Sequence, residues 1–232
     1  MNDEVKKKDR PKLTHGMIVA TAVKIADTEG IDSLSMRKVA SKLGVEAMSL
    51  YYHIANKNAL IAAMVEYIAP EIDPPTPDVD WQDAMTKRAH IVKAVLEKHT
   101  WAAHLFIAGF NDGRRMLTYS ASTIGYLLQA GFSTQLTDYA WNTIDSYIYG
   151  FNMQREDFPI DQSEYKKVAA QYLPYLSESE LPHARAMTQS IIDGTHDGQQ
   201  DFDFGLTIIL EGLERIRQKH VSETSKSKEY NQ

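Results

Sequence analysis

The sequence contains no cysteine, which excludes a disulfide scaffold, a thiolate metal site and a cysteine nucleophile. It also lacks any run of about 18 apolar residues and any apolar stretch behind the charged N-terminus, so it indicates neither a membrane span nor a signal peptide. The catalytic patterns HExxH, GxSxG, the Walker-type glycine loop and GxGxxG are absent as well. We therefore expect a soluble, cytoplasmic protein that is not an enzyme and needs no cofactor.

Two groupings of residue types that bind metals fail on spacing. His99 and His104 are five residues apart, which does not place them on one face of a helix. The acid-rich stretch at residues 193–203 lacks the order of an EF-hand loop and is expected to be a solvated connection. The sequence predicts no metal site.

Charge is divided unevenly along the chain. Its 232 residues, of which 43% are hydrophobic and 24% charged, can form one large globular domain or two modest ones. Residues 1–60 hold ten Lys and Arg against seven Asp and Glu, a net charge of +3, and the other 15 basic and 24 acidic residues give −9. A mildly basic segment beside an acidic remainder is typical of a small DNA-contacting module joined to a domain that does not bind DNA.

The stretch from Ser35 to Asn58 predicts a helix-turn-helix. Ser35 is a favourable helix N-cap, and the helix that follows has its apolar residues on one face and ends at Gly44. A second, short helix is expected from Glu46 to about Ile54. A motif of this kind places its second helix in the major groove of DNA.

The residues before this motif complete a three-helix unit. An amphipathic helix is expected from Thr14 to Glu29, because a bare helix-turn-helix has too little core to fold alone. Residues 1–12 lack apolar periodicity and are expected to form a disordered basic arm. Two interpretations of this arm stay open: a solvated tail, or a segment that contacts phosphates or the minor groove.

Three segments of this region carry a family resemblance: GIDSLSMRKVASKLGV (Gly30–Val45), SLYYHI (Ser49–Ile54) and NKNALIAAM (Asn56–Met64). Together they resemble the tetracycline-repressor (TetR) family of bacterial transcriptional repressors. The resemblance implies an all-α fold in which a three-helix DNA-binding domain precedes a larger helical domain that binds an effector. It also implies a homodimer.

The outer, N-terminal part of the second helix of the motif carries the residues that we expect to meet base edges: Ala47, Met48 and Tyr51. Alanine and methionine cannot form the bidentate hydrogen bonds that read guanine or adenine, so direct readout is expected to rely on thymine methyl groups and on Tyr51. The resemblance implies phosphate contacts, which position the protein without reading sequence, at a further set of residues: Arg37, Ser49, Tyr52, His53 and Lys57.

The expected position of Lys57 at the start of a helix also favours a phosphate contact. Asn56 is a natural N-cap, which places Lys57 in the first turn of the next helix, where a cation opposes the helix dipole. A phosphate bound at that helix end would account for the cation, because helix N-termini bind anions. The alternative is an exposed lysine without a role.

Prolines mark the boundary between two domains. The helix from Asn58 to about Ala69 is expected to couple them, and the segment PEIDPPTPDVD that follows holds four of the eight prolines and cannot be the interior of a helix. The predicted order is a disordered arm (1–12), a helix-turn-helix domain with its coupling helix (13–69), a proline-rich linker (70–80), a helical effector-binding and dimerisation domain (81–221) and a disordered tail (222–232). About nine to ten helices and no strand are expected.

The last predicted helix, DFDFGLTIILEGLERIRQKH, has apolar side chains over too wide an arc to be covered by one surface. Its two glycines lie seven residues apart, on one face, where close approach by another helix would compensate for their low helix propensity. We expect this helix to pair with the helix at residues 133–154 and with the two-fold mates of both. The predicted dimer interface includes Trp141, Ile148, Gly205, Ile208 and Gly212. The alternative is a fully buried core helix of a monomer.

The larger domain is expected to bind a small molecule. Polar and aromatic residues within otherwise apolar helices are the candidates to line its cavity: His104, Arg115, Tyr119, Tyr126, Trp141, Asn142 and Asp145. The helix ending in IAPEID has no histidine where the tetracycline repressor uses one, so tetracycline with Mg²⁺ is not predicted. The 12 Tyr, 7 Phe and 3 Trp residues favour a hydrophobic or aromatic effector.

These features predict a sequence-specific transcriptional regulator. We expect a homodimeric repressor that binds pseudo-palindromic operator duplex through two recognition helices about 34–36 Å apart and is released by its effector. Two alternatives remain, a DNA-binding protein without a ligand and an enzyme with a fused DNA-binding domain. Stabilisation by a ligand would argue against the first, and turnover of a bound compound would support the second.

Overall fold

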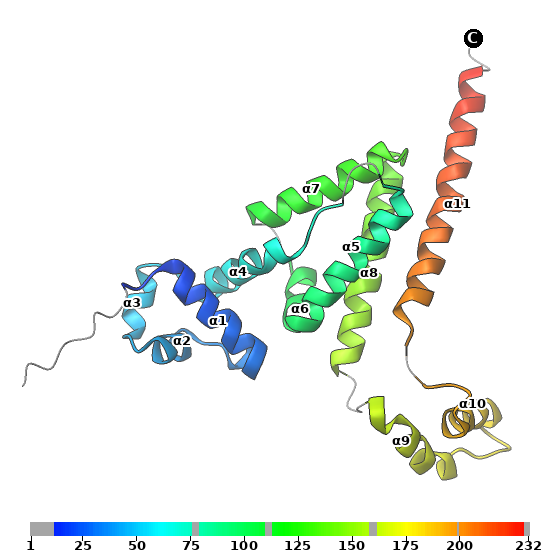
Figure 1. The fold of residues 1–232 in the computed structure, drawn as a ribbon, viewed down its shortest axis with the longest axis horizontal. Coiled ribbons are helices and arrows are strands. Elements are labelled where there is room, and N and C mark those ends of the chain that lie inside the picture. The colour runs from blue at the N-terminus through cyan, green and yellow to red at the C-terminus, as the bar shows by residue number, and fades with distance from the viewer. Residues whose placement is uncertain (1–11, 76–78, 110–112, 158–161, 199, 230–232) are drawn as a thin grey trace, which may run out of the picture. The chain divides into compact units, whose positions relative to one another are not determined.

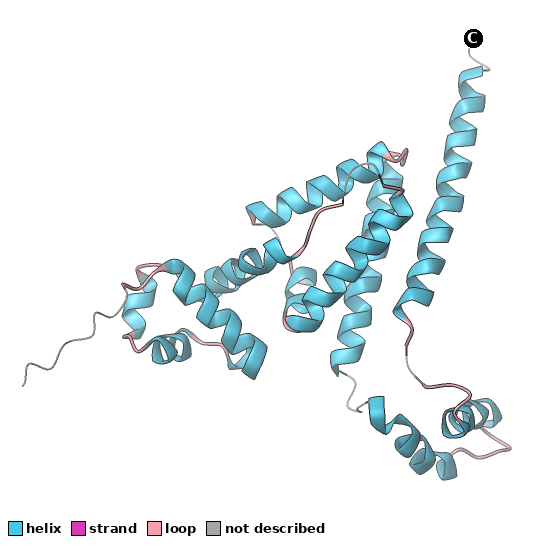
Figure 2. Cartoon of the chain, in the orientation of Figure 1, coloured by secondary structure: helices cyan, strands magenta, loops and turns pink. Residues whose placement is uncertain are grey.

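The computed structural model describes residues 12–75, 79–109, 113–157, 162–198 and 200–229. Within these ranges every regular element is a helix, with eleven α-helices, four short 3-10 turns and no strand (Figure 2). The all-α prediction is confirmed, with one helix more than expected because six residues at 102–107 form a helix of their own. The chain divides into two compact units, one up to Trp141 and one from Asn142, which are described separately.

The first unit begins with three helices (Figure 1): α1 (His15–Glu29), α2 (Met36–Leu43) and α3 (Ala47–Tyr51). We call α1 to α3 the head. The hydroxyl of Thr14 caps α1 by accepting from the backbone N–H of Met17 at 3.2 Å, and that of Ser35 caps α2 in the same way. Gly44 ends α2 in the left-handed conformation, with φ 67° and ψ 34°, which glycine adopts without strain. The predicted helix-turn-helix is therefore present.

The recognition helix α3 is shorter than expected and is attached to the head by one side chain. Leu50 is the only buried residue of α3, at 0% exposure, and it packs into the head beside α2. The backbone N–H groups of His53 and Ile54 both donate to the carbonyl of Leu50, which closes the helix there. Ile54 then turns inward and is 4% exposed.

The next helix, α4 (Lys57–Ile68), leaves the head and packs against both α1 and α7. Asn56 caps it as predicted, because its side-chain oxygen accepts from the backbone N–H of Ala59 at 2.9 Å. A 3-10 turn at Ala69–Glu71 follows without interruption. Four side chains of α4 are completely buried: Leu60, Met64, Val65 and Ile68.

Replacing Asn56 by alanine is expected to lower the free energy of unfolding by about 1 kcal/mol, since the first turn of α4 loses its capping oxygen. Urea unfolding followed by circular dichroism measures the change. Asn58→Ala is the matched control, because Asn58 is an exposed residue inside the same turn, and it is expected to change the free energy by less than about 0.5 kcal/mol. Equal losses in the two variants would contradict the assigned cap.

The body helices of the first unit are α5 (Trp81–Lys98), α6 (Ala102–Ile107) and α7 (Arg114–Gln129), followed by the start of α8 (Thr134–Asp157). The carboxylate of Asp80 caps α5 by accepting from the backbone N–H of Gln82 at 2.8 Å. Trp81 then packs edge-on against Phe132, with ring centroids 4.8 Å apart. This contact joins the start of α5 to the chain just before α8.

The N-terminus of α7 is capped by a residue from another helix. Its N-cap residue is Gly113, which has no side chain to offer, and the Glu66 carboxylate of α4 accepts from the backbone N–H groups of Arg115 and Met116 at 3.1 Å. The guanidinium of Arg115 donates in return to the backbone carbonyl of Glu66 at 3.1 Å. A Cβ atom at Gly113 would overlap the Glu66 carboxyl group. We call this reciprocal contact the Glu66 cap, and it fastens α4 to α7.

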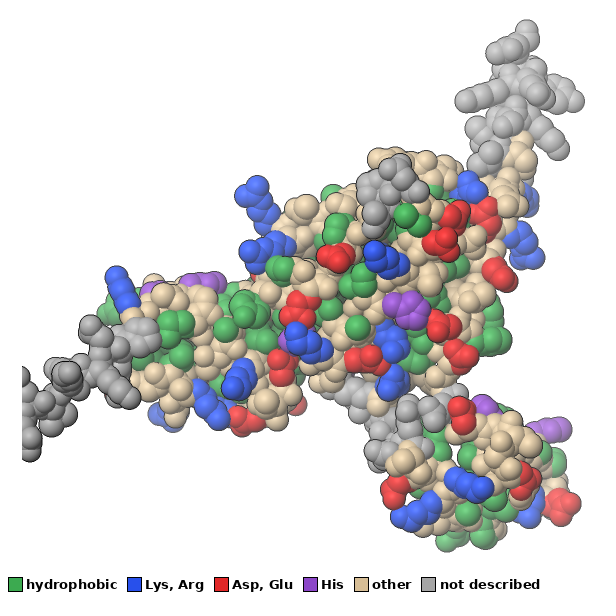
Figure 3. Space-filling view, viewed as in Figure 1, with side chains coloured by type: hydrophobic (Ala, Val, Ile, Leu, Met, Phe, Trp, Pro, Cys, Tyr) green, Lys and Arg blue, Asp and Glu red, His purple; other side chains and the backbone are tan. Residues whose placement is uncertain are grey.

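The second unit contains the rest of α8, α9 (Tyr165–Tyr172), α10 (Pro182–Asp193) and α11 (Phe202–Glu229). The last eight residues of α11, 222–229, are helical where the sequence predicted a tail. Helix α9 packs against α10. Hydrophobic side chains remain at the surface of this pair (Figure 3), namely Tyr172, Tyr175, Leu181 and Met187.

Within the second unit, α8 and α11 pair through an aromatic cluster, as the glycine spacing suggested. The ring of Tyr147 stacks on Phe202 with centroids 5.3 Å apart, and a Cβ at Gly205 would overlap the Tyr147 phenol. The Tyr147 hydroxyl donates to the carbonyl of Phe202 at 2.9 Å. Burial, with smaller effects from the charges of Asp201 and Asp203, raises the pKa of this phenol, which keeps it a donor.

Candidate DNA interface and effector site

The eight residues predicted to contact DNA lie at the start of α2, along α3, in the turn after it and at the start of α4. Three large side chains of this set are strongly exposed: Met48 at 68%, Tyr51 at 47% and Tyr52 at 85%. Arg37, His53 and Lys57 are exposed too, whereas Ala47 and Ser49 are half-buried. Every predicted DNA contact is therefore reachable from solvent.

Lys57 is the first residue of α4, directly after the N-cap. This is the position that the sequence predicted, with a cation at the positive end of a twelve-residue helix. The placement suits a phosphate, which the side-chain cation and the helix end would both attract.

Two other lysines of the head form ion pairs with an acidic residue of the same domain. Lys38 lies 2.6 Å from the carboxylate of Glu29, and Lys42 lies 3.5 Å from it, so one acidic residue at the end of α1 holds two cations of α2. The hydrogen bond from Lys38 lowers the pKa of Glu29, although desolvation opposes it. Arg37, between these lysines and Ser35, remains exposed for a phosphate.

The sequence reasoning missed one residue of the body, Arg88. Its side chain is 1% exposed and its guanidinium lies over the ring of Tyr119, 5.3 Å from the centroid, which is a cation–π geometry. The spacing along α5 indicates its burial. Arg88 lies seven residues after Trp81 and three after Met85, both buried, and therefore on the apolar face of the helix.

Arg88 lines a cavity of about 150 Å³ in the first unit. The walls come from α5, through Asp83, Ala84, Lys87 and Ile91, and from residues 73–75 and Val79. Two of the predicted effector residues contact residues of this wall without lining the cavity themselves. Tyr119 lies under the Arg88 guanidinium, and the Tyr126 hydroxyl donates to the carbonyl of Val79. A cavity of this size has room for a single aromatic ring.

The other predicted effector residues do not gather there. Arg115 is exposed and bound to Glu66, His104 is exposed on α6, and Trp141 is half-buried. Asn142 and Asp145 belong to the second unit, where Asn142 is exposed and Asp145 accepts from the Tyr149 hydroxyl at 3.1 Å.

The predicted interface residues of the second unit differ in what covers them. Ile208 is 55% exposed, and a Cβ at Gly212 would meet no atom within 4 Å, so this part of α11 is open. Gly205 is covered by Tyr147 of the same chain. Ile148 is 0% exposed and is a core residue of its own protomer.

No group of three or more metal-ligating side chains comes together within the described ranges. None of their helices is both long and apolar enough to cross a bilayer.

Similar proteins cover nearly the whole chain. The tetracycline repressor of class C from Escherichia coli is 27% identical over 211 residues, which is 89% of this chain and 93% of the relative. The transcriptional repressor DrrR1 of Streptomyces coeruleorubidus is 27% identical over 88% of this chain and 78% of its own. The fold is similar to that of ActR of Streptomyces coelicolor, solved with (S)-DNPA, with a TM-score of 0.72, 24% identity and coverage of 87% of this chain and 97% of ActR.

A further solved structure, BioQ with its double-stranded DNA operator, has a TM-score of 0.60 and 24% identity over 87% of this chain and 98% of BioQ. Two family models match the sequence. The model of bacterial regulatory proteins of the tetR family matches residues 18–64, and that of the tetracyclin repressor-like C-terminal domain matches residues 73–217, which is more than half of the chain. The predicted family is confirmed, and the chain belongs to the tetR family of bacterial regulatory proteins.

Proposed function

We propose that this protein is a homodimeric transcriptional repressor of the cytoplasm, not an enzyme, that binds operator DNA through α3 and releases it when a small molecule binds the body. The exposed recognition helix carries the proposal. A five-residue helix that buries one side chain and leaves Met48 and Tyr51 in water, with Tyr52 exposed directly after it, gains little from folding on the protein alone. When α3 lies in a major groove, these exposed side chains contact DNA.

Base reading is assigned to Ala47, Met48 and Tyr51, whose apolar surfaces suit thymine methyl groups. Phosphate binding is assigned to Arg37, Ser49, Tyr52, His53 and Lys57. BioQ, a structural neighbour, was solved with its double-stranded DNA operator, which supports duplex DNA as the partner here. A dimer presents two such heads to a pseudo-palindrome, and the exposed face of α11 around Ile208 supplies apolar surface for the dimer contact.

The effector site is assigned to the body of the first unit, at the cavity beside Arg88, Tyr119 and Tyr126. Its walls combine apolar side chains with the charged groups of Asp83, Lys87 and Arg88, which suits an apolar ligand with polar substituents. ActR and the tetracycline repressors are similar proteins whose names or structures record small molecules, which supports a ligand of this kind. The Glu66 cap places α4, the helix that leaves the head, in direct contact with α7, which carries both tyrosines. The effector therefore acts on the head through α4.

Tyr51→Ala is expected to relax sequence preference. Among the three base-reading residues, Tyr51 is the one whose side chain can form a hydrogen bond to a base, and the substitution removes it. The measurement is fluorescence anisotropy of the wild type and the variant with the protein's own upstream DNA and with a random duplex. The dissociation constant for the random duplex divided by that for the upstream DNA is expected to fall about tenfold. This is the discrimination typical of one base contact. An unchanged ratio would contradict the role of Tyr51.

Lys57→Ala is expected to weaken binding to every duplex and to reduce the slope of log affinity against log salt by about one, since one phosphate contact is lost. A salt series on both duplexes measures this slope. Lys167→Ala is the matched control. It also removes one positive charge, from an exposed lysine of α9 that forms an ion pair with Glu164. Identical slopes for the two variants would show that Lys57 does not bind phosphate.

A further inference from the structure

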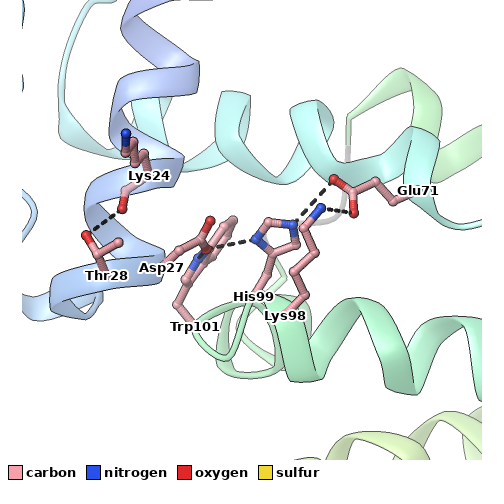
Figure 4. A network of polar contacts seen from close by, with 7 residues as sticks. All are labelled: Lys24, Asp27, Thr28, Glu71, Lys98, His99 and Trp101. Atoms are coloured by element: carbon pink, nitrogen blue, oxygen red, sulfur yellow. Dashed lines mark hydrogen bonds and ion pairs between the residues drawn. The ribbon is translucent and has the colours of Figure 1, made fainter.

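A polar network around the buried ring of His99 joins the head to the body (Figure 4). Asp27, near the end of α1, accepts two hydrogen bonds on the same carboxylate oxygen, from Nδ1 of His99 at 2.8 Å and from the indole N–H of Trp101 at 2.6 Å. His99 ends α5, and Trp101 precedes α6. Asp27 of the head is therefore held by two aromatic residues of the body.

The second nitrogen of His99 faces another carboxylate. Its Nε2 lies 3.4 Å from Glu71, which ends the 3-10 turn after α4, and the ring is 3% exposed. Lys98 binds the other oxygen of Glu71 at 2.7 Å. The charged groups that face the imidazole are thus Asp27 from α1 and Glu71 from the turn after α4, with Lys98 of its own helix behind Glu71. We call these four residues the His99 clamp.

A carboxylate oxygen can only accept a hydrogen bond, so both ring nitrogens must donate for both contacts to be favourable. A neutral imidazole has one N–H group, which Asp27 takes. Its other nitrogen would then direct a lone pair at Glu71. The hydrogen bond from Lys98, helped by His99 and opposed by partial burial, lowers the pKa of Glu71, so this residue stays a carboxylate throughout the range in which histidine titrates.

We propose that His99 is a positioning residue that bridges Asp27 of the head and Glu71 of the turn after α4 only while its imidazole is protonated, so that protons strengthen operator binding through the clamp. The inference rests on the proposed function. The clamp is complete at low pH, and its Glu71 contact is lost as pH rises and the ring loses its proton. Without the Glu71 contact, α4 is held less firmly at its end, and the head that precedes it samples more orientations. This lowers the fraction of molecules that can bind both half-sites and raises the apparent dissociation constant.

The test compares wild type, Glu71→Gln and His90→Gln at pH 6 and pH 8, on a duplex that wild type has selected from a random library. Glutamine at 71 can accept from the protonated ring or donate to the neutral ring, so Glu71→Gln keeps the contact at both pH values. Between pH 6 and pH 8, wild type is expected to lose about three- to tenfold more affinity than Glu71→Gln, the range for one partly exposed charge-assisted hydrogen bond. Effects of the DNA-contacting His53 are common to both proteins and cancel.

His90→Gln is the matched control, because His90 is an exposed histidine of the same helix, and it is expected to behave as wild type. Equal pH ratios in wild type and Glu71→Gln would overturn the proposal. If wild type selects no sequence at either pH, the proposed function fails, and thermal unfolding without DNA then decides the inference. Wild type is expected to lose about 2–4 °C more than Glu71→Gln between pH 6 and pH 8, and equal losses overturn the clamp whether or not DNA binds.

Discussion

Replacing Leu50 by alanine is expected to abolish operator binding and to destabilise the head by about 2–5 kcal/mol. The side chain is the only fully buried one of α3, so its removal leaves a cavity where the helix is most firmly held. Hydrogen exchange is expected to show faster exchange of the α3 amides. Anisotropy with the selected duplex is expected to show no sequence preference.

Met48→Ala is the control for Leu50→Ala, because it truncates an exposed side chain of the same helix in place of a buried one. Met48 belongs to the same helix and is 68% exposed, so its truncation is expected to leave the free energy of unfolding within about 0.5 kcal/mol of wild type. Loss of stability in Met48→Ala equal to that in Leu50→Ala would mean that α3 has further contacts with the fold.

Gly113→Ala is expected to lower the free energy of unfolding by about 2 kcal/mol, although the backbone at this position, with φ −67° and ψ 156°, is one that alanine adopts readily. The loss comes from the new Cβ, which displaces the Glu66 carboxylate from the N-terminus of α7 and breaks its hydrogen bonds to two backbone N–H groups. Chemical unfolding measures the change.

A double-mutant cycle isolates this cause. In a Glu66→Ala background the carboxylate is already gone, and Gly113→Ala is expected to cost less than about 0.5 kcal/mol. A loss of about 2 kcal/mol in both backgrounds would instead place the effect of the substitution in the backbone of residue 113.

Local signals in the sequence were enough to locate most helix starts and stops. Ser35, Asn56 and Asp80 each cap a helix because a side chain reaches an N–H two or three residues away, an arrangement that spacing alone reveals. The eight DNA contacts and the domain boundaries followed from the same local pattern together with the family resemblance, and they stay predictions.

The features that sequence reasoning missed depend on contacts between distant segments. Glu66 caps a helix that begins 48 residues later, and nothing in the residues around it marks this partner. Arg88 packs on Tyr119 of another helix, a partner that the residues around it in the sequence do not indicate. The His99 clamp joins α1, the turn after α4 and the end of α5, and it has no signature in any one of them.

The attachment of α3 through Leu50 makes operator choice an evolvable trait. Since Ala47, Met48, Tyr51 and Tyr52 contribute little to the core, they can be exchanged for other residues without loss of the folded state. Duplicated copies of this chain can therefore acquire new operators rapidly while keeping one effector-binding body. For protein engineering, a library randomised at these four residues, with Leu50 unchanged, amounts to a set of folded repressors that differ in their DNA targets.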